Sequence, residues 1–195
     1  MRQFSAILAL SLIVSCQSPT DGVATAPVAP PVDLSNWATE LIQFPPHFAP
    51  TMPAGRESLL FSPGWRTEGA EDNWAYALLM ELEEPNVGAE RIGEILDLYY
   101  DGLMGMVARN NKPFTIPEDP SDVTMRSLGD GRFEAQVKTY DSFKDGSPLT
   151  LNMLVAAEYP NATTTILRIR ACRHEPGNTQ VWDQLQQALD SLSFE

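Results

Sequence analysis

Alternating apolar and polar positions predict where the chain forms strands. The clearest alternation runs from 74 to 83, where every second position is apolar: Trp74, Tyr76, Leu78, Met80 and Leu82. This period of two is typical of a strand with one apolar face. Further strands are predicted at 57–61, 123–128, 132–140, 149–159 and 163–172. The last four are joined by short, turn-rich connections such as Gly129-Asp130-Gly131, which favour antiparallel hairpins.

A helical period replaces this alternation between 87 and 110. Starting at Ile92, apolar residues recur at intervals of three and four as far as Val107, so one long helix is predicted. The segment also contains the glycines Gly88, Gly93, Gly102 and Gly105. Each glycine costs a helix up to about 1 kcal/mol relative to alanine. Their presence indicates a close backbone approach to a sheet, a bend, or simple irregularity.

Near its start the chain is expected to form a short helix over 36–43, with Asp33 or Ser35 as its cap. The apolar side of this helix would be formed by Trp37, Leu41 and Phe44. A proline-rich stretch at 45–53 follows. Because proline removes backbone donors, this stretch is expected to run irregularly over the surface.

A C-terminal amphipathic helix is predicted from Val181 to Leu192, with Asn178 or Thr179 as its cap. The predicted order is therefore helix, two strands, long helix, four strands and helix. Runs of strands broken by one long helix favour an α+β fold. We expect a single domain over 33–195, with an antiparallel sheet of about five to six strands, and with the long helix and the C-terminal helix packed on its apolar face.

The composition excludes two classes of protein. The 195 residues include 13 basic and 26 acidic ones, which gives a formal net charge of −13. This charge repels phosphate backbones, so no nucleic-acid partner is expected. Hydrophobic residues make up 43% of the chain. That share is enough to bury a core, so disorder is excluded for most of the chain.

The first fifteen residues have the character of an export signal. They begin with Met-Arg, continue with an apolar run of about eleven residues and end in the small residue Ser15. A run of this length is too short to cross a bilayer, which needs roughly 20 residues. Residues 1–15 are therefore expected to be a cleaved signal peptide.

The segment Leu12-Ile13-Val14-Ser15-Cys16 resembles the bacterial lipoprotein signal, the lipobox. The resemblance implies cleavage between Ser15 and Cys16, a diacylglyceryl group on the Cys16 thiol and an acyl chain on the new amino terminus. Several acyl chains together hold a protein stably on a membrane. Gln17 after the lipidated cysteine implies sorting to the outer membrane, on its periplasmic or surface face. The alternative is an ordinary secretory signal with a coincidental cysteine.

Residues 16–32 are expected to connect this lipid to the domain. They contain four prolines and no periodic pattern, which is typical of a tether. Proline favours extended conformations with about 3.1 Å per residue, so this segment could hold the domain up to about 50 Å from the membrane.

The folded part resembles a group of uncharacterised exported bacterial proteins. The resemblance is based on five short sequence segments: Phe48-Ala49-Pro50, Phe61-Ser62-Pro63-Gly64-Trp65, Asp72-Asn73-Trp74-Ala75-Tyr76, Tyr99-Tyr100-Asp101-Gly102-Leu103 and Pro148-Leu149-Thr150-Leu151-Asn152. They span most of 48–182. The resemblance implies an exported bacterial protein and supplies no catalytic residue.

Established catalytic and metal-binding motifs are absent from the sequence: it contains no HExxH, GxSxG, CxxC, Walker or GxGxxG pattern. No cofactor or metal is therefore expected. Cys172 and His174 are candidate functional residues, because side chains two positions apart on an extended chain project to the same face, where a histidine can hold a thiolate. The alternative is an inert cysteine near a strand end and a solvated histidine.

Two other groups of side chains are open to a functional or a structural interpretation. Acidic side chains could collect calcium, although their spacing matches no calcium loop, and a solvated acidic face is the alternative. They are Glu81, Glu83 and Glu84, with Glu68, Glu71 and Asp72 nearby in the sequence. Aromatic residues could line a groove for sugars or peptides, or could simply form the core. These residues are Trp65, Trp74, Tyr76, Tyr99, Tyr100 and Tyr140.

We therefore expect an envelope lipoprotein that is held on the membrane through lipid on Cys16. Its domain is expected to act as a non-enzymatic module that binds a protein or a small-molecule ligand. One alternative is a hydrolase acting on envelope polymers, with acidic residues or Cys172 as its reactive groups. The other is a structural component of an envelope assembly.

Overall fold

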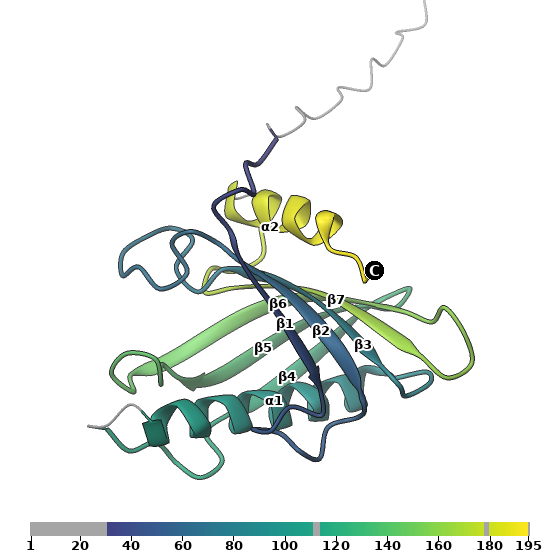
Figure 1. The fold of residues 1–195 in the computed structure, drawn as a ribbon, viewed down its shortest axis with the longest axis horizontal. Helices are drawn as coiled ribbons and strands as arrows, with labels where there is room; N and C mark the ends of the chain where they lie inside the picture. Colours follow the sequence, from purple (N-terminus) through teal and green to yellow (C-terminus); the bar gives the residue numbers. More distant parts are fainter. Residues whose placement is uncertain (1–30, 111–113, 178–179, 195) are drawn as a thin grey trace, which may run out of the picture.

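The domain is built on one antiparallel sheet (Figure 1). The computed structural model describes residues 31–110, 114–177 and 180–194. Seven strands follow the order β1-β2-β3-β7-β6-β5-β4 across the sheet. Their bounds are β1 Ala38–Phe44, β2 Gly55–Phe61, β3 Tyr76–Leu82, β4 Asp122–Gly129, β5 Arg132–Tyr140, β6 Pro148–Glu158 and β7 Thr165–Cys172. Every neighbouring pair is antiparallel, which confirms the predicted α+β class.

Two helices cover opposite faces of this sheet (Figure 1). The long helix α1, Ala89–Asn110, packs on one face, over the larger hydrophobic cluster. The C-terminal helix α2, Gln180–Ser191, packs on the other face and buries a smaller cluster with β3 and β7. The sequence predicts both helices on one apolar face. The structure differs because the even-numbered residues of β3 face α1, while Ala77 on β3 and Ala75 just before it face α2.

The predicted helix over 36–43 is wrong, because this segment forms the edge strand β1. Trp37, Leu41 and Phe44 have helical spacing, but the structure sends them to different environments. Trp37 packs into the cluster under α2, Phe44 packs into the cluster under α1, and Leu41 is 65% exposed. An edge strand pairs on one side only and is largely exposed, so it lacks the alternation that marks the inner strands. With β1 included, the sheet has seven strands, whereas about five to six were expected.

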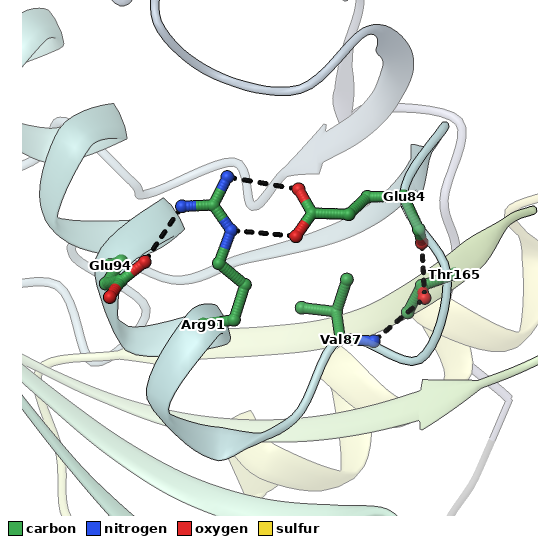
Figure 2. Close-up of polar contacts among 5 residues, drawn as sticks. All are labelled: Glu84, Val87, Arg91, Glu94 and Thr165. Atoms are coloured by element: carbon green, nitrogen blue, oxygen red, sulfur yellow. Dashed lines mark hydrogen bonds and ion pairs between the residues drawn. The ribbon is translucent and has the colours of Figure 1, made fainter.

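The start of α1 is fastened to the sheet by a polar cluster (Figure 2). The Arg91 guanidinium donates to both carboxylate oxygens of Glu84, at 2.9 and 3.0 Å, and to Glu94 at 2.8 Å. Beneath it, the buried Thr165 hydroxyl donates to the Glu84 carbonyl at 2.8 Å and accepts from the Val87 amide at 3.3 Å. These bonds join β7, the segment after β3 and the first turn of α1, and so fix where the helix begins.

The proline-rich segment between β1 and β2 packs against the middle of α1. A Cβ atom on Gly102 would lie 2.1 Å from the carbonyl oxygen of Phe48, so only glycine permits this approach. Ala49 and Met52 from the same segment are buried in the core. The helix backbone therefore approaches the loop closely at Gly102, as the glycines in the helix indicated. At Gly93, by contrast, an added Cβ atom would meet only the side chain of Met125 on β4.

The residues before β1 run along α2 (Figure 1). The Val32 amide donates to the Gln187 side chain at 2.9 Å, and Val32 and Leu34 pack against the cluster under α2. The expected tether therefore contacts the domain at Val32, its last residue. The described parts of the chain include no helix that is long and apolar enough to span a membrane.

Candidate functional site

A cavity of about 560 Å³ lies between α1 and the β1–β3 side of the sheet. The α1 backbone approaches β4 and β5 closely and lies farther from β1, β2 and β3, so side chains must fill the wider gap, and they fill it incompletely. The lining is mostly apolar and aromatic: Leu41, Ile42, Phe48, Leu59, Phe61, Trp65, Trp74, Tyr76, Tyr99, Tyr100, Leu103, Met106, Val107 and Phe143. Glu40, Gln43, His47 and Arg66 complete it. We call this space the apolar cavity.

Three aromatic rings close one end of the apolar cavity. Trp65, Trp74 and Phe143 pack edge to face with one another, with ring centroids 5.7 to 5.9 Å apart. Trp74 has a φ of 59°, which is rare for a bulky residue and costs conformational energy. Its backbone amide donates to the Trp65 carbonyl at 2.9 Å, and its indole N–H donates to Asp141 at 3.1 Å. These bonds hold the rings in fixed positions.

A buried carboxyl group, which is not itself a lining residue, lies next to the cavity residues Ile42 and Tyr99. Glu57 on β2 projects from the same face as Leu59 and Phe61, and its neighbour on β1 is Ile42. Its side chain is fully buried. Tyr99 donates to Oε1 at 2.8 Å, while Oε2 has no hydrogen-bond partner among the described residues.

This environment determines the charge of Glu57. The pKa of the Glu57 carboxyl is raised to about 8, mainly by burial and to a smaller extent by the carboxylate of Glu40, while the hydrogen bond from Tyr99 acts in the opposite direction. The carboxyl is therefore mostly protonated and uncharged at neutral pH, which suits an apolar wall.

Two further phenols form the neutral polar part of the same wall. The hydroxyls of Tyr76 and Tyr100 are hydrogen-bonded to each other. Burial raises the pKa of both groups well above the ordinary value for tyrosine. Both therefore stay protonated, and each hydroxyl is already engaged, so they add no charge to the cavity.

A second, more polar cavity of about 290 Å³ adjoins the aromatic end. It shares Trp65, Arg66, Trp74 and Phe143 with the apolar cavity. Its other lining residues are Glu68, Asn73, Asp141, Lys144, Asp145, Ser147 and Arg173. The Arg66 guanidinium lies over the Trp65 ring at 4.9 Å and over the Phe143 ring at 4.7 Å, measured to the centroids. We call this second space the polar notch.

The candidate pair Cys172 and His174 lies away from the apolar cavity. Cys172 is fully buried in the cluster under α2, on the opposite face of the sheet. Burial raises the pKa of its thiol. His174 is exposed, and its imidazole Nε2 lies 2.8 Å from the Glu71 carbonyl oxygen. The contact between the two residues is made by the His174 backbone amide, 3.5 Å from the sulfur.

Two of the glutamates considered for calcium, Glu81 and Glu84, pair with arginines. Glu81 pairs with Arg56 at 3.2 Å, and Glu84 pairs with Arg91 at 2.9 Å. Within the described ranges, His, Cys, Asp and Glu side chains form no group of three or more that could hold a metal ion.

The aromatic candidates serve both as core and as cavity wall. Of the six, all except Tyr140 line the apolar cavity, and four of these five are also buried core residues. Sequence reasoning missed Glu57, Arg66 and Phe143. The signal for Glu57 was present, because a glutamate shares a strand face with Leu59 and Phe61. No local pattern connects Arg66 with Phe143, which meet only through the fold.

Ser15 and Cys16, the expected cleavage and lipidation residues, lie outside the described residues. Comparison with known proteins gave no match to a family model, a curated protein or a solved structure.

Proposed function

We propose that this chain is a lipid-anchored envelope protein whose domain binds a small, mainly apolar molecule in the apolar cavity. The binding role is non-enzymatic. The main support for this binding role is the cavity itself, a preformed space between α1 and the sheet with aromatic and aliphatic walls.

The size and chemistry of the cavity support this role. Ligand sites usually have volumes of about 300–1,000 Å³ and combine apolar walls with a few polar groups. The apolar cavity lies within this range at about 560 Å³. Its charged residues Glu40 and Arg66 are exposed, while the buried Glu57 is mostly uncharged at neutral pH. An apolar ligand would therefore meet no buried charge.

The binding role can be tested by photolabelling the full lipidated protein in nanodiscs. The probe is phenyl(trifluoromethyl)diazirine, a small neutral aromatic molecule, and labelled peptides are located by mass spectrometry. We expect labelling to concentrate on peptides that contain cavity residues such as Leu103 and Met106. Labelling spread evenly over the surface would overturn the proposal.

Matched variants of α1 make this test specific. Leu103→Trp places a larger side chain in the cavity, because Leu103 lines it, and should reduce labelling by at least about fivefold. Leu98→Trp is the control, since Leu98 is also half-buried on α1 but is not a lining residue. Circular dichroism checks folding, and Met106→Trp replaces Leu103→Trp if that variant unfolds. Equal labelling of all three proteins would contradict cavity binding.

Attachment to the membrane is tested separately. The support for it is the lipobox sequence that ends at Cys16. Cells fed radioactive palmitate should label the wild-type protein and should leave Cys16→Ser unlabelled. If the Cys16→Ser protein still sediments with membranes at the mature size, the proposed anchor is wrong, whatever the outcome of the cavity experiment.

A further inference from the structure

The polar notch and the apolar cavity are neighbours that share one boundary. Trp65, Trp74 and Phe143 contribute to the walls of both spaces, and the exposed Arg66 lines both. One side of this boundary is mostly apolar, and the other is rich in charged groups. A ligand that extends past the boundary would therefore need an apolar part and a polar part.

The notch offers arginines that have no carboxylate partner. Neither Arg66 nor Arg173 forms an ion pair among the described residues, although the chain carries twice as many acidic as basic residues. The Arg66 guanidinium rests on two aromatic rings, and Arg173 donates only to the Asn73 side chain, at 3.0 Å. Guanidinium groups bind carboxylates and phosphates well because their N–H donors match the geometry of these anions.

Other charged groups in the notch are already engaged, with one exception. Lys144 pairs with Glu68 at 2.9 Å and lies 4.0 Å from Asp145. Asp141 accepts the Trp74 indole N–H on Oδ2, while its buried Oδ1 has no partner among the described residues. A head group with a hydroxyl beside its anion could donate to this oxygen.

The β1–β2 wall of the apolar cavity favours one orientation of a ligand. Glu40 lines the cavity and is the partner of Leu59 across β1 and β2, and the buried Glu57 lies behind the lining residue Tyr99. An anionic group would be repelled by Glu40 and would lose its hydration beside Leu59 and Ile42. The anion of a bound molecule should therefore lie beside Arg66, and its apolar chain should lie along Leu59 and Ile42.

We propose that the ligand is an anionic amphiphile. Its alkyl or acyl chain occupies the apolar cavity, and its carboxylate or phosphate lies against Arg66 and Arg173 in the polar notch. This inference rests on the proposed binding function and adds the chemical class of the ligand. A free fatty acid and a phosphate-bearing lipid share this chemistry.

Competition against the neutral photoprobe tests the ligand class. The lipidated protein in zwitterionic nanodiscs is labelled in the presence of octanoate, octyl phosphate, octanol or octylamine, which share one chain and differ in the head group. We expect octanoate or octyl phosphate to prevent labelling at concentrations at least about tenfold lower than octanol or octylamine. Preference for octanoate indicates a fatty acid, and preference for octyl phosphate indicates a phosphate-bearing lipid.

Variants of the notch show whether the arginines cause this preference. Arg66→Gln and Arg173→Gln should each reduce it by at least about fivefold, whereas Arg66→Lys should retain part of it. Arg132→Gln is the control, because Arg132 is an exposed arginine on β5 that lines neither space. All four variants should take up the neutral probe.

The outcomes separate the two proposals. If the neutral probe labels the cavity but octanol or octylamine competes as well as the anions, or if no competitor displaces the probe, the anionic amphiphile is wrong and the binding function stands. The same conclusion follows if both glutamine variants keep the full preference. If the probe does not label the cavity at all, both proposals fail.

Discussion

Tyr99 on α1 donates a hydrogen bond to Glu57 on β2, with 2.8 Å between the phenol oxygen and Oε1. This bond ties the helix to the sheet beside the apolar cavity, where the two backbones lie farther apart than at β4 and β5. Because Oε2 is buried without a partner among the described residues, ionisation of Glu57 places a poorly compensated charge in the core. Burial therefore favours the protonated carboxyl, although the hydrogen bond from Tyr99 by itself favours the carboxylate.

The first prediction concerns the pH dependence of stability. Glu57 has a pKa of about 8 in the folded protein, against an ordinary value of 4.5. The folded state then binds a proton that the unfolded state has released. Its contribution is fully present below about pH 4.5 and is lost as the pH rises through about 8. At about 1.4 kcal/mol for each pH unit of difference, the loss amounts to several kcal/mol.

Urea unfolding at several pH values between 5 and 9, chosen to span the pKa of about 8, measures this loss. Glu57→Gln cannot ionise and keeps an oxygen acceptor for Tyr99, so its free energy of unfolding should fall much less over this range. Because the remaining titratable groups are the same in both proteins, the difference between the curves isolates Glu57. Parallel curves would show that Glu57 is ionised or solvated in the folded state.

The inner strands and α1 could be predicted because in each of them apolar residues recur at a regular interval on the face that packs against a core. β5 has the predicted bounds Arg132–Tyr140, and α1 begins two residues after the predicted start at 87 and ends at the predicted 110. β1 was missed because its role depends on pairing with β2 rather than on a pattern of its own. The spacing of Trp37, Leu41 and Phe44 suggested a helix, yet these residues reach the two faces and the solvent-exposed edge of a sheet.

The site was less predictable than the fold. Trp65, Trp74 and Tyr99 were noted as candidate aromatic residues, but whether they filled a core or lined a groove depended on the distance between α1 and the sheet. No local sequence pattern encodes that distance. Glu57 and Asp141 likewise acquire their roles only from burial. Conversely, the spacing of Cys172 and His174 suggested a reactive pair, whereas the structure places their side chains in separate environments.

The second prediction concerns the contact of Gly102 with the proline-rich segment. Gly102→Ala should destabilise the protein by about 1–3 kcal/mol, because the added methyl group meets the Phe48 backbone, which must move. Gly105→Ala in the same helix is the matched control. A Cβ atom there meets only the end of the Arg109 side chain, at 3.3 Å, so this change should be neutral or stabilising by up to about 1 kcal/mol. Chemical denaturation compares the two, and equal effects would contradict the close approach.

The third prediction concerns Thr165 beneath the start of α1 (Figure 2). Thr165→Val keeps the shape of the side chain and leaves the Glu84 carbonyl and the Val87 amide without their partner. We expect a loss of about 1–3 kcal/mol in unfolding free energy. Thr124→Val on the exposed face of β4 should change stability by less than about 0.5 kcal/mol. A similar small effect at Thr165 would mean that water replaces the hydroxyl.

The fourth prediction concerns the Cys172 thiol. Reaction with a disulfide reagent requires the thiolate and access to it. Cys172 is fully buried under α2, and burial raises the pKa of its thiol. In a Cys16→Ser background, where Cys172 is the one remaining cysteine of the sequence, the native protein should therefore react with dithiobis(nitrobenzoate) at least about a hundredfold more slowly than the same protein in guanidinium. His174→Ala should leave the native rate unchanged, because the His174 imidazole contacts Glu71 rather than the sulfur. A fast native reaction that slows in His174→Ala would instead indicate a histidine-activated thiolate, and would restore the reactive pair as a candidate site.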